Sequence, residues 1–298
     1  MLSLEVLASL DLSIWMRSGE CAGQRLQINQ SSVSRNCRRA LHLFQLKLHR
    51  EDQEWSVQGD TTLLQLERRV HQLARWQAMA PLRLEATYWS GPLLASPPPP
   101  GWLLGNCDIV GVGLPLALLK DGLIDAWIAG GPDWPEPDDP DLATLPLCSY
   151  PVHLVVGENH PLLRQPCINW DDVAAFPSLA LPAGTYPKVE ACLQELGLWN
   201  SPVRMRRYRR DRWEGKTELD LTIGYATVLS ELVAGAQRRL PLNLPLNSGE
   251  SLVVRREFAR HPSTLALAAE LLRRLEPFAA DAAEISLLPL AAAVPAVP

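Results

Sequence analysis

The sequence predicts an α/β protein that begins with a helix-turn-helix and a wing. Residues 21–41 have the pattern of helix, tight turn and helix, and residues 46–59 have the length and turn residues of a two-stranded wing. Residues 61–79 carry a single long amphipathic pattern. After Pro81, short apolar strands alternate with helices. That alternation is typical of a parallel sheet with crossover helices.

The predicted helix-turn-helix has a second helix rich in hydroxyls and arginines. An apolar face restarts at helical spacing after the polar break at 29–31, with Val33, Cys37 and Leu41. Short polar side chains and arginines can reach base edges and phosphates in a DNA major groove. A surface hairpin with a solvated basic face is the alternative interpretation. The predicted DNA contacts are Gln30, Ser31, Ser32, Ser34, Arg35, Arg38 and Arg39, with Arg50 of the wing at a phosphate.

The formal net charge of −5 is unevenly distributed along the chain. Residues 17–50 hold seven basic residues and the single acid Glu20, whereas residues 81–298 hold 18 basic and 25 acidic residues. The positive field is therefore local to the first segment. It would supply sequence-independent affinity for DNA through counterion release.

The long helix predicted within 61–79 has one apolar stripe. Its members recur at three- and four-residue steps, and charged residues occupy the other faces. Such a stripe either packs on its own domain or pairs with a second copy of the chain. The stripe residues are Leu63, Leu66, Val70, Leu73 and Trp76.

The body after Pro81 is predicted to begin with strands at 82–87, 108–113 and 126–129 and a helix at 116–121. Further strands are expected at 147–157, 178–181 and 251–256, with helices at 188–196 and 263–275. The proline-rich segment 91–101 predicts a shortened or absent helix. The alanine-, leucine- and proline-rich tail after Ala280 is expected to be poorly ordered.

Several functional classes are disfavoured by composition and spacing. The six cysteines form neither a Cys-x-x-Cys motif nor a Cys/His cluster, so no metal site, disulfide framework or cofactor is predicted. We find no nucleophile elbow, metal-spaced histidine pair or glycine-rich phosphate loop, so no catalytic residues are assigned and an enzyme is not expected. Without a signal peptide or membrane span, the chain is expected in the cytoplasm, away from the membrane.

The order of these elements and several short motifs resemble the LysR-type transcriptional regulators. Residues 29–35, Asn-Gln-Ser-Ser-Val-Ser-Arg, are similar to the family's turn and recognition-helix start, and 56–59 are similar to the Thr-x-x-Gly that closes its wing. Residues 158–162 resemble its Asp-His-Pro-Leu turn. The chain departs from the family at Gly19, where an aromatic residue is usual, at Ser31, which replaces the turn proline, and in the wing at 46–50.

The resemblance implies a winged helix-turn-helix domain at 1–60, a linker and dimerisation helix at 61–80, and a periplasmic-binding-protein-like effector domain at 81–298. Its first subdomain would comprise about 81–147 and 252–280, and its second about 148–251. The implied partners are double-stranded promoter DNA, a small-molecule effector and a second copy in a dimer or tetramer. The predicted effector contacts, each of which could instead be a simple turn residue, are Thr87, Trp89, Ser90, Gly113, Gly130, Gly184 and Thr185.

Two questions stay open at the level of sequence. Six arginines fall within residues 204–212, and they could form a solvated edge, an anion contact or an auxiliary DNA-facing patch. The departures at Gly19, Ser31 and the wing also allow a different class of function. In that alternative the chain is a ligand-sensing or protein-interaction module that has lost specific DNA recognition.

Overall fold

The computed structural model describes residues 2–51, 53–219, 221–235 and 237–290 and divides into two compact units. The first unit comprises Met1–Glu85, Pro98–Asn106 and Leu116–Ala126. The second comprises Ala86–Pro97, Cys107–Pro115 and Trp127–Pro298.

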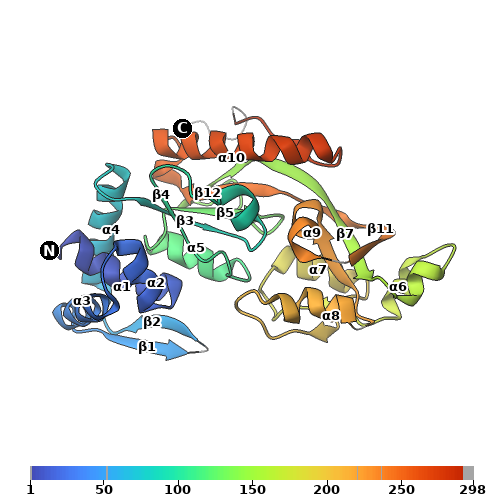
Figure 1. Ribbon diagram of the computed structural model, residues 1–298, viewed down its shortest axis with the longest axis horizontal. Coiled ribbons are helices and arrows are strands. Elements are labelled where there is room, and N and C mark those ends of the chain that lie inside the picture. The colour runs from blue at the N-terminus through green and yellow to red at the C-terminus, as the bar shows by residue number, and fades with distance from the viewer. Residues whose placement is uncertain (1, 52, 220, 236, 291–298) are drawn as a thin grey trace. The chain divides into compact units, whose positions relative to one another are not determined.

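The first unit begins with three short helices and a two-stranded hairpin (Figure 1). Each helix begins at a polar N-cap, because the side chains of Ser3, Ser18 and Asn29 accept hydrogen bonds from backbone N–H groups of the first turns. A Cβ at Gly23 would lie 2.7 Å from the Ile28 carbonyl oxygen, so the tight turn requires glycine there. The elements are α1 (Leu4–Met16), α2 (Gly19–Leu26), α3 (Gln30–Leu43), β1 (Lys47–Glu51) and β2 (Glu54–Gln58).

The long helix follows as α4 (Thr62–Trp76), as predicted. In the same unit, strand β3 (Leu82–Ala86) pairs in parallel with β4 (Trp102–Leu104). Between these strands the proline-rich segment forms only the five-residue π-helical turn η1 (Gly91–Ala95), so the expected shortening of a helix is confirmed. Helix α5 (Gly113–Lys120) precedes β5 (Ala126–Gly130).

One predicted strand is wrong. Residues 108–113 contain only an isolated bridge between Ile109 and Arg207, and the strand lies earlier, at β4. Gly111 has φ +90°, which breaks an extended backbone, and Gly113 already begins α5. In the second unit, β6 (Leu142–Pro146) pairs antiparallel with β12 (Glu250–Arg255).

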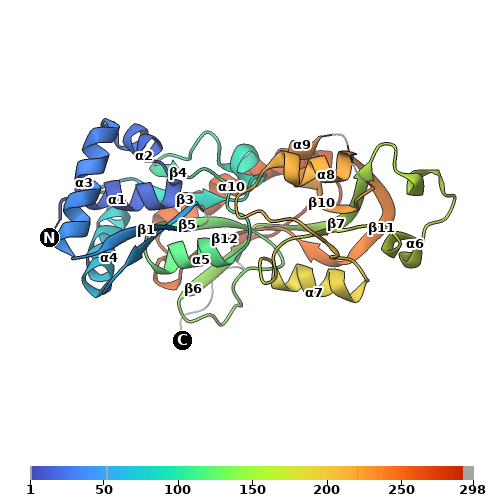
Figure 2. The ribbon, with the colours of Figure 1, turned by 90° about the horizontal axis from the view of Figure 1, so that it is seen from below.

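The second sheet of the molecule is built on β7 (Cys148–Gly157), which pairs antiparallel with β10 (Gly224–Thr227) and β11 (Gln237–Ser248). In Figure 2, α7 lies on one side of these strands and α8 and α9 on the other. An apolar core that includes Val156, Leu193 and Leu240 joins the strands to α7. The helices are α7 (Pro187–Glu195), α8 (Glu214–Leu219) and α9 (Val228–Ala234).

Smaller elements complete the second unit. They are η2 (Pro161–Arg164), α6 (Trp170–Ala174), β8 (Leu179–Ala180), β9 (Ser201–Pro202), η3 (Arg210–Arg212) and η4 (Arg256–Phe258). Helix α10 (Pro262–Asp281) continues past the predicted end, and β13 (Ser286–Leu287) then pairs with β7. The prediction of a poorly ordered tail is therefore wrong for residues up to 290, because backbone pairing holds this segment. Residues 291–298 lie outside the described residues.

Candidate functional site

The predicted DNA contacts share one feature, which is that none of them is buried. Ser34 and Arg35 are exposed on the first turns of α3, while the apolar side chains of Val33 and Ala40 point into the protein. Arg35 donates a 3.0 Å hydrogen bond to the Ser32 hydroxyl. The helix therefore presents hydroxyls and guanidinium groups outward. The exposed positions are Gln30, Ser31, Ser34, Arg35, Arg38, Arg39 and, on β1, Arg50, and Ser32 is half-buried.

Helix α4 of the first unit has an exposed apolar stripe opposite a buried polar face. Leu63 and Leu66 are 64% and 61% exposed, and Val70 and Leu73 are also exposed. Trp76, the fifth member of the predicted stripe, is buried and packs edge-on against Trp102, with their centroids 6.1 Å apart. The other four leave an apolar surface along the helix.

The polar face of α4 belongs to a buried charged cluster. The Arg68 guanidinium donates to Asp11 of α1 at 2.9 Å, and Arg83 of β3 lies 3.5 Å from the same carboxylate. Arg75 makes two hydrogen bonds with Asp125, of 2.7 and 2.9 Å. Because α1 is buried on nearly all sides, its carboxylate requires these cationic partners.

A second buried contact in the first unit joins α1 to β3. The Trp15 indole N–H donates a 2.6 Å hydrogen bond to the Glu85 carboxylate, and both side chains are almost fully buried. The packing is close, because a Cβ at Gly105 would lie 2.6 Å from the Trp15 ring. The first helix of the winged domain is thus fixed to the start of the body within this unit.

The second unit contains a partly open pocket with about 80 Å³ of free space. Six of its lining residues are aromatic and six are aliphatic or sulfur-containing, whereas no lining side chain is charged. Such a concave apolar lining is typical of small-molecule sites. The lining residues are Tyr88, Trp89, Val110, Gly130, Gly131, Val152, Leu181, Tyr186, Val189, Met205, Tyr208, Trp213, Tyr225, Ala226, Thr227, Ser230 and Ser248.

One buried carboxylate supports the pocket wall from behind. Glu250 is fully buried and accepts hydrogen bonds of 2.6 Å from the Trp89 indole N–H, the Ser90 hydroxyl and the Tyr150 hydroxyl. Burial raises the pKa of Glu250 to about 7, although these three donors oppose the shift. Its charge therefore changes near neutral pH. The Ser90 hydroxyl also lies 2.5 Å from that of Thr87.

A second buried carboxylate, Glu214, joins two stacked tyrosines. Tyr208 donates to it at 2.7 Å and Tyr88 at 3.1 Å, and the two rings stack with their centroids 3.5 Å apart. Burial raises the pKa of Glu214. Burial, together with the neighbouring Glu214 carboxylate, also raises the pKa of Tyr88 and of Tyr208. Both phenols therefore remain protonated donors.

The predicted effector residues fall into three groups. Trp89 and Gly130 line the pocket, and a Cβ at Gly130 would lie 2.7 Å from the Trp89 ring. Thr87 and Ser90 lie outside the lining, where they contact each other and Ser90 donates to Glu250. The remaining three lie outside the lining as well. Gly113 is exposed at the start of α5, Gly184 is exposed, and the Thr185 hydroxyl donates to the Pro182 carbonyl.

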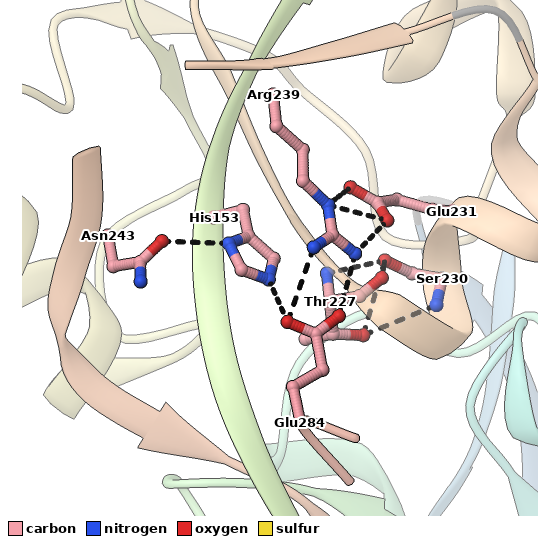
Figure 3. A network of polar contacts seen from close by, with 7 residues as sticks. All are labelled: His153, Thr227, Ser230, Glu231, Arg239, Asn243 and Glu284. Carbon is pink, nitrogen blue, oxygen red and sulfur yellow. Dashed lines mark hydrogen bonds and ion pairs between the residues drawn. The ribbon is translucent and has the colours of Figure 1, made fainter. Parts of the chain in front are cut away.

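One wall of the pocket leads into a polar network (Figure 3). Thr227 and Ser230, which line the pocket, form the capping box of α9. Glu231, the next residue of α9, pairs with Arg239 of β11, which also pairs with Glu284. His153 of β7 completes the network through Glu284, at 2.9 Å, and Asn243, at 2.8 Å. Helix α9 thus contributes residues to the pocket wall and, through Glu231 and Arg239, contacts the segment after α10.

The arginines of residues 204–212 are largely engaged in internal contacts. Arg207 pairs with Asp108 at 2.7 Å, Arg210 pairs with Glu218 at 2.7 Å, and the exposed Arg209 pairs with Asp211. Between the arginines, Met205 and Tyr208 point into the pocket. These contacts favour a structural role over a free anion-binding patch.

Residues 2–51, 53–219, 221–235 and 237–290 contain no group of three or more His, Cys, Asp or Glu side chains that could hold a metal ion. Within the same ranges, no helix combines the length and the apolar character needed to cross a membrane.

Several important residues were not predicted from the sequence. The tyrosines of the pocket and the two carboxylates behind it come from separate elements, so no local motif marks them. One local signal was available in residues 203–206, where buried Val203 and Met205 alternate with exposed Arg204 and Arg206. That period of two indicates an extended segment with one apolar face.

The fold and the two sites define a protein with a winged helix-turn-helix, a long linker helix and a periplasmic-binding-protein-like effector domain. The LysR substrate binding domain family matches residues 110–276. This chain belongs to the LysR family, and the predicted fold class is confirmed. A comparison with curated proteins finds no match.

Solved structures of LysR-type regulators resemble almost the whole chain. A full-length OxyR variant from Pseudomonas aeruginosa is 17% identical, with a TM-score of 0.54 over 92% of this chain and 95% of that chain. A probable transcriptional regulator from the same organism is 15% identical, with a TM-score of 0.55 over 91% and 96%. Full-length CbnR, in complex with its target DNA, is 16% identical, with a TM-score of 0.51 over 92% and 99%. These matches indicate no enzyme family.

Proposed function

We propose that this chain is a LysR-type DNA-binding transcriptional regulator whose effector domain binds a small ligand and thereby modulates promoter binding. The observation that carries the proposal is the outward face of α3, where Ser34 and Arg35 are exposed on a helix held by a buried apolar face. A recognition helix must present such groups to base edges. The matched CbnR structure contains target DNA, which supports the same role here.

The domain assignment is part of this proposal. The winged helix-turn-helix comprises residues 1–60, the linker helix 61–80 and the effector domain 81–298. Of the predicted effector contacts, Trp89 and Gly130 touch the ligand directly, and Thr87 and Ser90 act through Glu250, which holds the Trp89 indole. Gly113, Gly184 and Thr185 stay predictions.

DNA recognition is tested with the chain's own upstream region and a scrambled duplex of equal length. We expect preferential binding to the upstream region that weakens steeply with salt, because phosphate contacts release counterions. Arg35→Ala should weaken this binding by about 1–3 kcal/mol, the range for an arginine that contacts a base. Arg238→Ala is the control, since that arginine is also exposed but lies on β11 and pairs with Glu158.

Equal affinity of the native chain for both duplexes would instead favour the alternative function, a ligand-sensing module without specific DNA recognition. An unchanged affinity in Arg35→Ala would count against α3 as the recognition helix. Fluorescence anisotropy over a series of salt concentrations distinguishes these outcomes.

Self-association through α4 is the second part of the proposal. Four exposed apolar side chains on one helix face require a cover, and a second copy of the same helix would bury them around a two-fold axis. We expect Leu66→Glu to shift the protein toward a smaller species in sedimentation velocity. Leu219→Glu is the matched control, because Leu219 is 86% exposed on α8 and outside the stripe. Identical sedimentation of the two variants would rule out this interface.

A further inference from the structure

We propose that the pocket of the second unit accepts a small uncharged aromatic molecule and excludes carboxylate anions. This inference rests on the proposed function of the pocket as the effector site. It concerns the chemical class of the effector, which follows from the lining and from the buried groups behind it.

The lining provides apolar and aromatic surface but no cation. Among the seventeen residues around the pocket, all of them in the described part of the chain, there is no Arg, Lys or His side chain. Two arginines of the segment 204–212 are engaged elsewhere, Arg207 with Asp108 and Arg210 with Glu218. A bound carboxylate would therefore lose its water without gaining a salt bridge.

Several hydrogen-bond donors of the lining already donate to other acceptors. The hydroxyls of Tyr88 and Tyr208 donate to Glu214, and the Trp89 indole N–H donates to Glu250. The Ser248 hydroxyl donates to the Gly131 carbonyl at 2.7 Å. A carboxylate in the pocket could recruit these donors only by leaving another buried acceptor unsatisfied.

Three buried acids surround the lining and oppose a ligand of the same charge. Glu214 and Glu250 lie behind the aromatic wall, and Asp133 accepts hydrogen bonds from the backbone N–H groups of Lys188 and Val189 at the start of α7. The faces of the aromatic rings also carry negative potential. Both effects repel a carboxylate.

The aromatic side chains favour a flat ligand. Trp213 and Tyr225 meet edge-on with their centroids 5.2 Å apart, while Tyr88 and Tyr208 present a stacked pair. Such walls bind another ring by offset stacking and edge contacts. An apolar cavity of about 150 Å³ can hold benzene. The free space in this partly open pocket is about 80 Å³, roughly half as large, so it admits nothing bulkier than a single ring.

The test uses three probes that share one ring and differ in charge: benzyl alcohol, benzoate and benzylammonium. Isothermal titration calorimetry with the full chain at pH 8 compares their dissociation constants. We expect benzyl alcohol to bind at least about tenfold more tightly than benzoate, a difference of about 1.4 kcal/mol. Equal or tighter binding of benzoate would overturn the proposal, as would tightest binding of benzylammonium or no binding of any probe.

Two variants at the half-buried Val110 show whether benzoate binds weakly because the lining carries no positive charge. Val110→Arg places a guanidinium at the pocket and should strengthen benzoate binding about tenfold, whereas the neutral Val110→Gln should leave benzoate weak. Equal benzoate affinity in these two variants would contradict the charge argument.

Ala226→Leu, which fills the pocket, should abolish binding of benzyl alcohol while the melting temperature shows a folded protein. If that variant does not fold, Val110→Trp gives the same test from the half-buried position. Binding that survives the filled pocket would place the site elsewhere and overturn the proposal.

The DNA assay separates this inference from the proposed function. If benzoate binds best while the upstream region is still recognised, only the ligand class is wrong. If the probes bind in the expected order and the chain has no preference for the upstream duplex, only the regulatory proposal fails.

Discussion

Two pairs of buried acids, Asp11 with Asp125 in the first unit and Glu214 with Glu250 in the second, are neutralised in different ways. In the first unit, Asp125 faces the guanidinium of Arg75, and Asp11 faces two further arginines. In the second unit, Glu250 and Glu214 accept hydrogen bonds from neutral side-chain donors, namely hydroxyls and an indole N–H. Asp11 and Asp125 are therefore compensated in charge, whereas the direct partners of Glu214 and Glu250 supply hydrogen bonds only.

Because their partners differ, the two pairs of acids should respond differently to pH. A guanidinium remains charged at any physiological pH, so an acid paired with it holds its elements together under all such conditions. Neutral donors compensate burial incompletely, and the pKa of Glu250 accordingly rises to about 7. The acids paired with arginines therefore hold their elements together at any physiological pH, whereas Glu250 can respond to pH beside the pocket.

The largest expected effect comes from breaking a pair in the first unit. Asp125→Ala leaves the Arg75 guanidinium, which is 4% exposed, without its carboxylate. We expect the free energy of unfolding to fall by about 3–5 kcal/mol, the usual cost of an uncompensated buried charge. Urea denaturation followed by circular dichroism measures the change.

Asp211→Ala is the matched control for this prediction, because Asp211 also pairs with an arginine but is 64% exposed. Its effect should stay below about 1 kcal/mol, since water already screens the exposed pair. Similar losses in the two variants would show that the pair in the first unit is not held by buried charge.

The second effect is a pH dependence in the second unit. The pKa of Glu250 is about 7 in the folded protein and near its ordinary value of 4.5 when unfolded. Between these values the folded state binds the extra proton, so the free energy of unfolding should fall by about 3 kcal/mol as pH rises from 4.5 to 7. Above pH 7 this contribution is constant.

Glu250→Gln should remove that decline, and the difference between the native and variant profiles isolates this one group. Urea midpoints from pH 4.5 to 8 provide the measurement. Parallel profiles would mean that Glu250 does not titrate in this range, and the contrast between the two pairs of acids would then be lost.

The sequence was most informative where function depends on local pattern. The helix-turn-helix, wing and linker follow from apolar spacing and polar caps within short stretches, and Ser34 and Arg35 lie on the exposed face as periodicity requires. In the body, the strand predicted at 108–113 does not form, because Gly111 has a positive φ and Gly113 already begins α5. These two features override the apolar run.

The pocket could not be predicted in the same way. Glu250 meets Ser90 and Tyr150 across 160 and 100 residues of sequence, so only the folded chain brings these side chains together. The predicted residues Trp89 and Gly130 line the pocket because they follow or end strands, where ligands of α/β proteins bind. Their aromatic neighbours arise from packing that no spacing rule encodes.

The smallest predicted effect concerns the hydrogen bonds of Glu214. Tyr208→Phe removes the 2.7 Å donor and keeps the stacked ring, so unfolding should require about 2 kcal/mol less at pH 8. Tyr88→Phe removes the 3.1 Å donor to the same group and should cost less, because the longer bond is weaker.

Loss of either donor raises the pKa of Glu214 further, so both costs should shrink as the carboxyl group becomes protonated at low pH. Urea midpoints at pH 5 and pH 8 compare the two variants. A loss of equal size at both pH values would indicate that the tyrosines act through packing alone, and Glu214 would then no longer belong with Glu250 in the comparison.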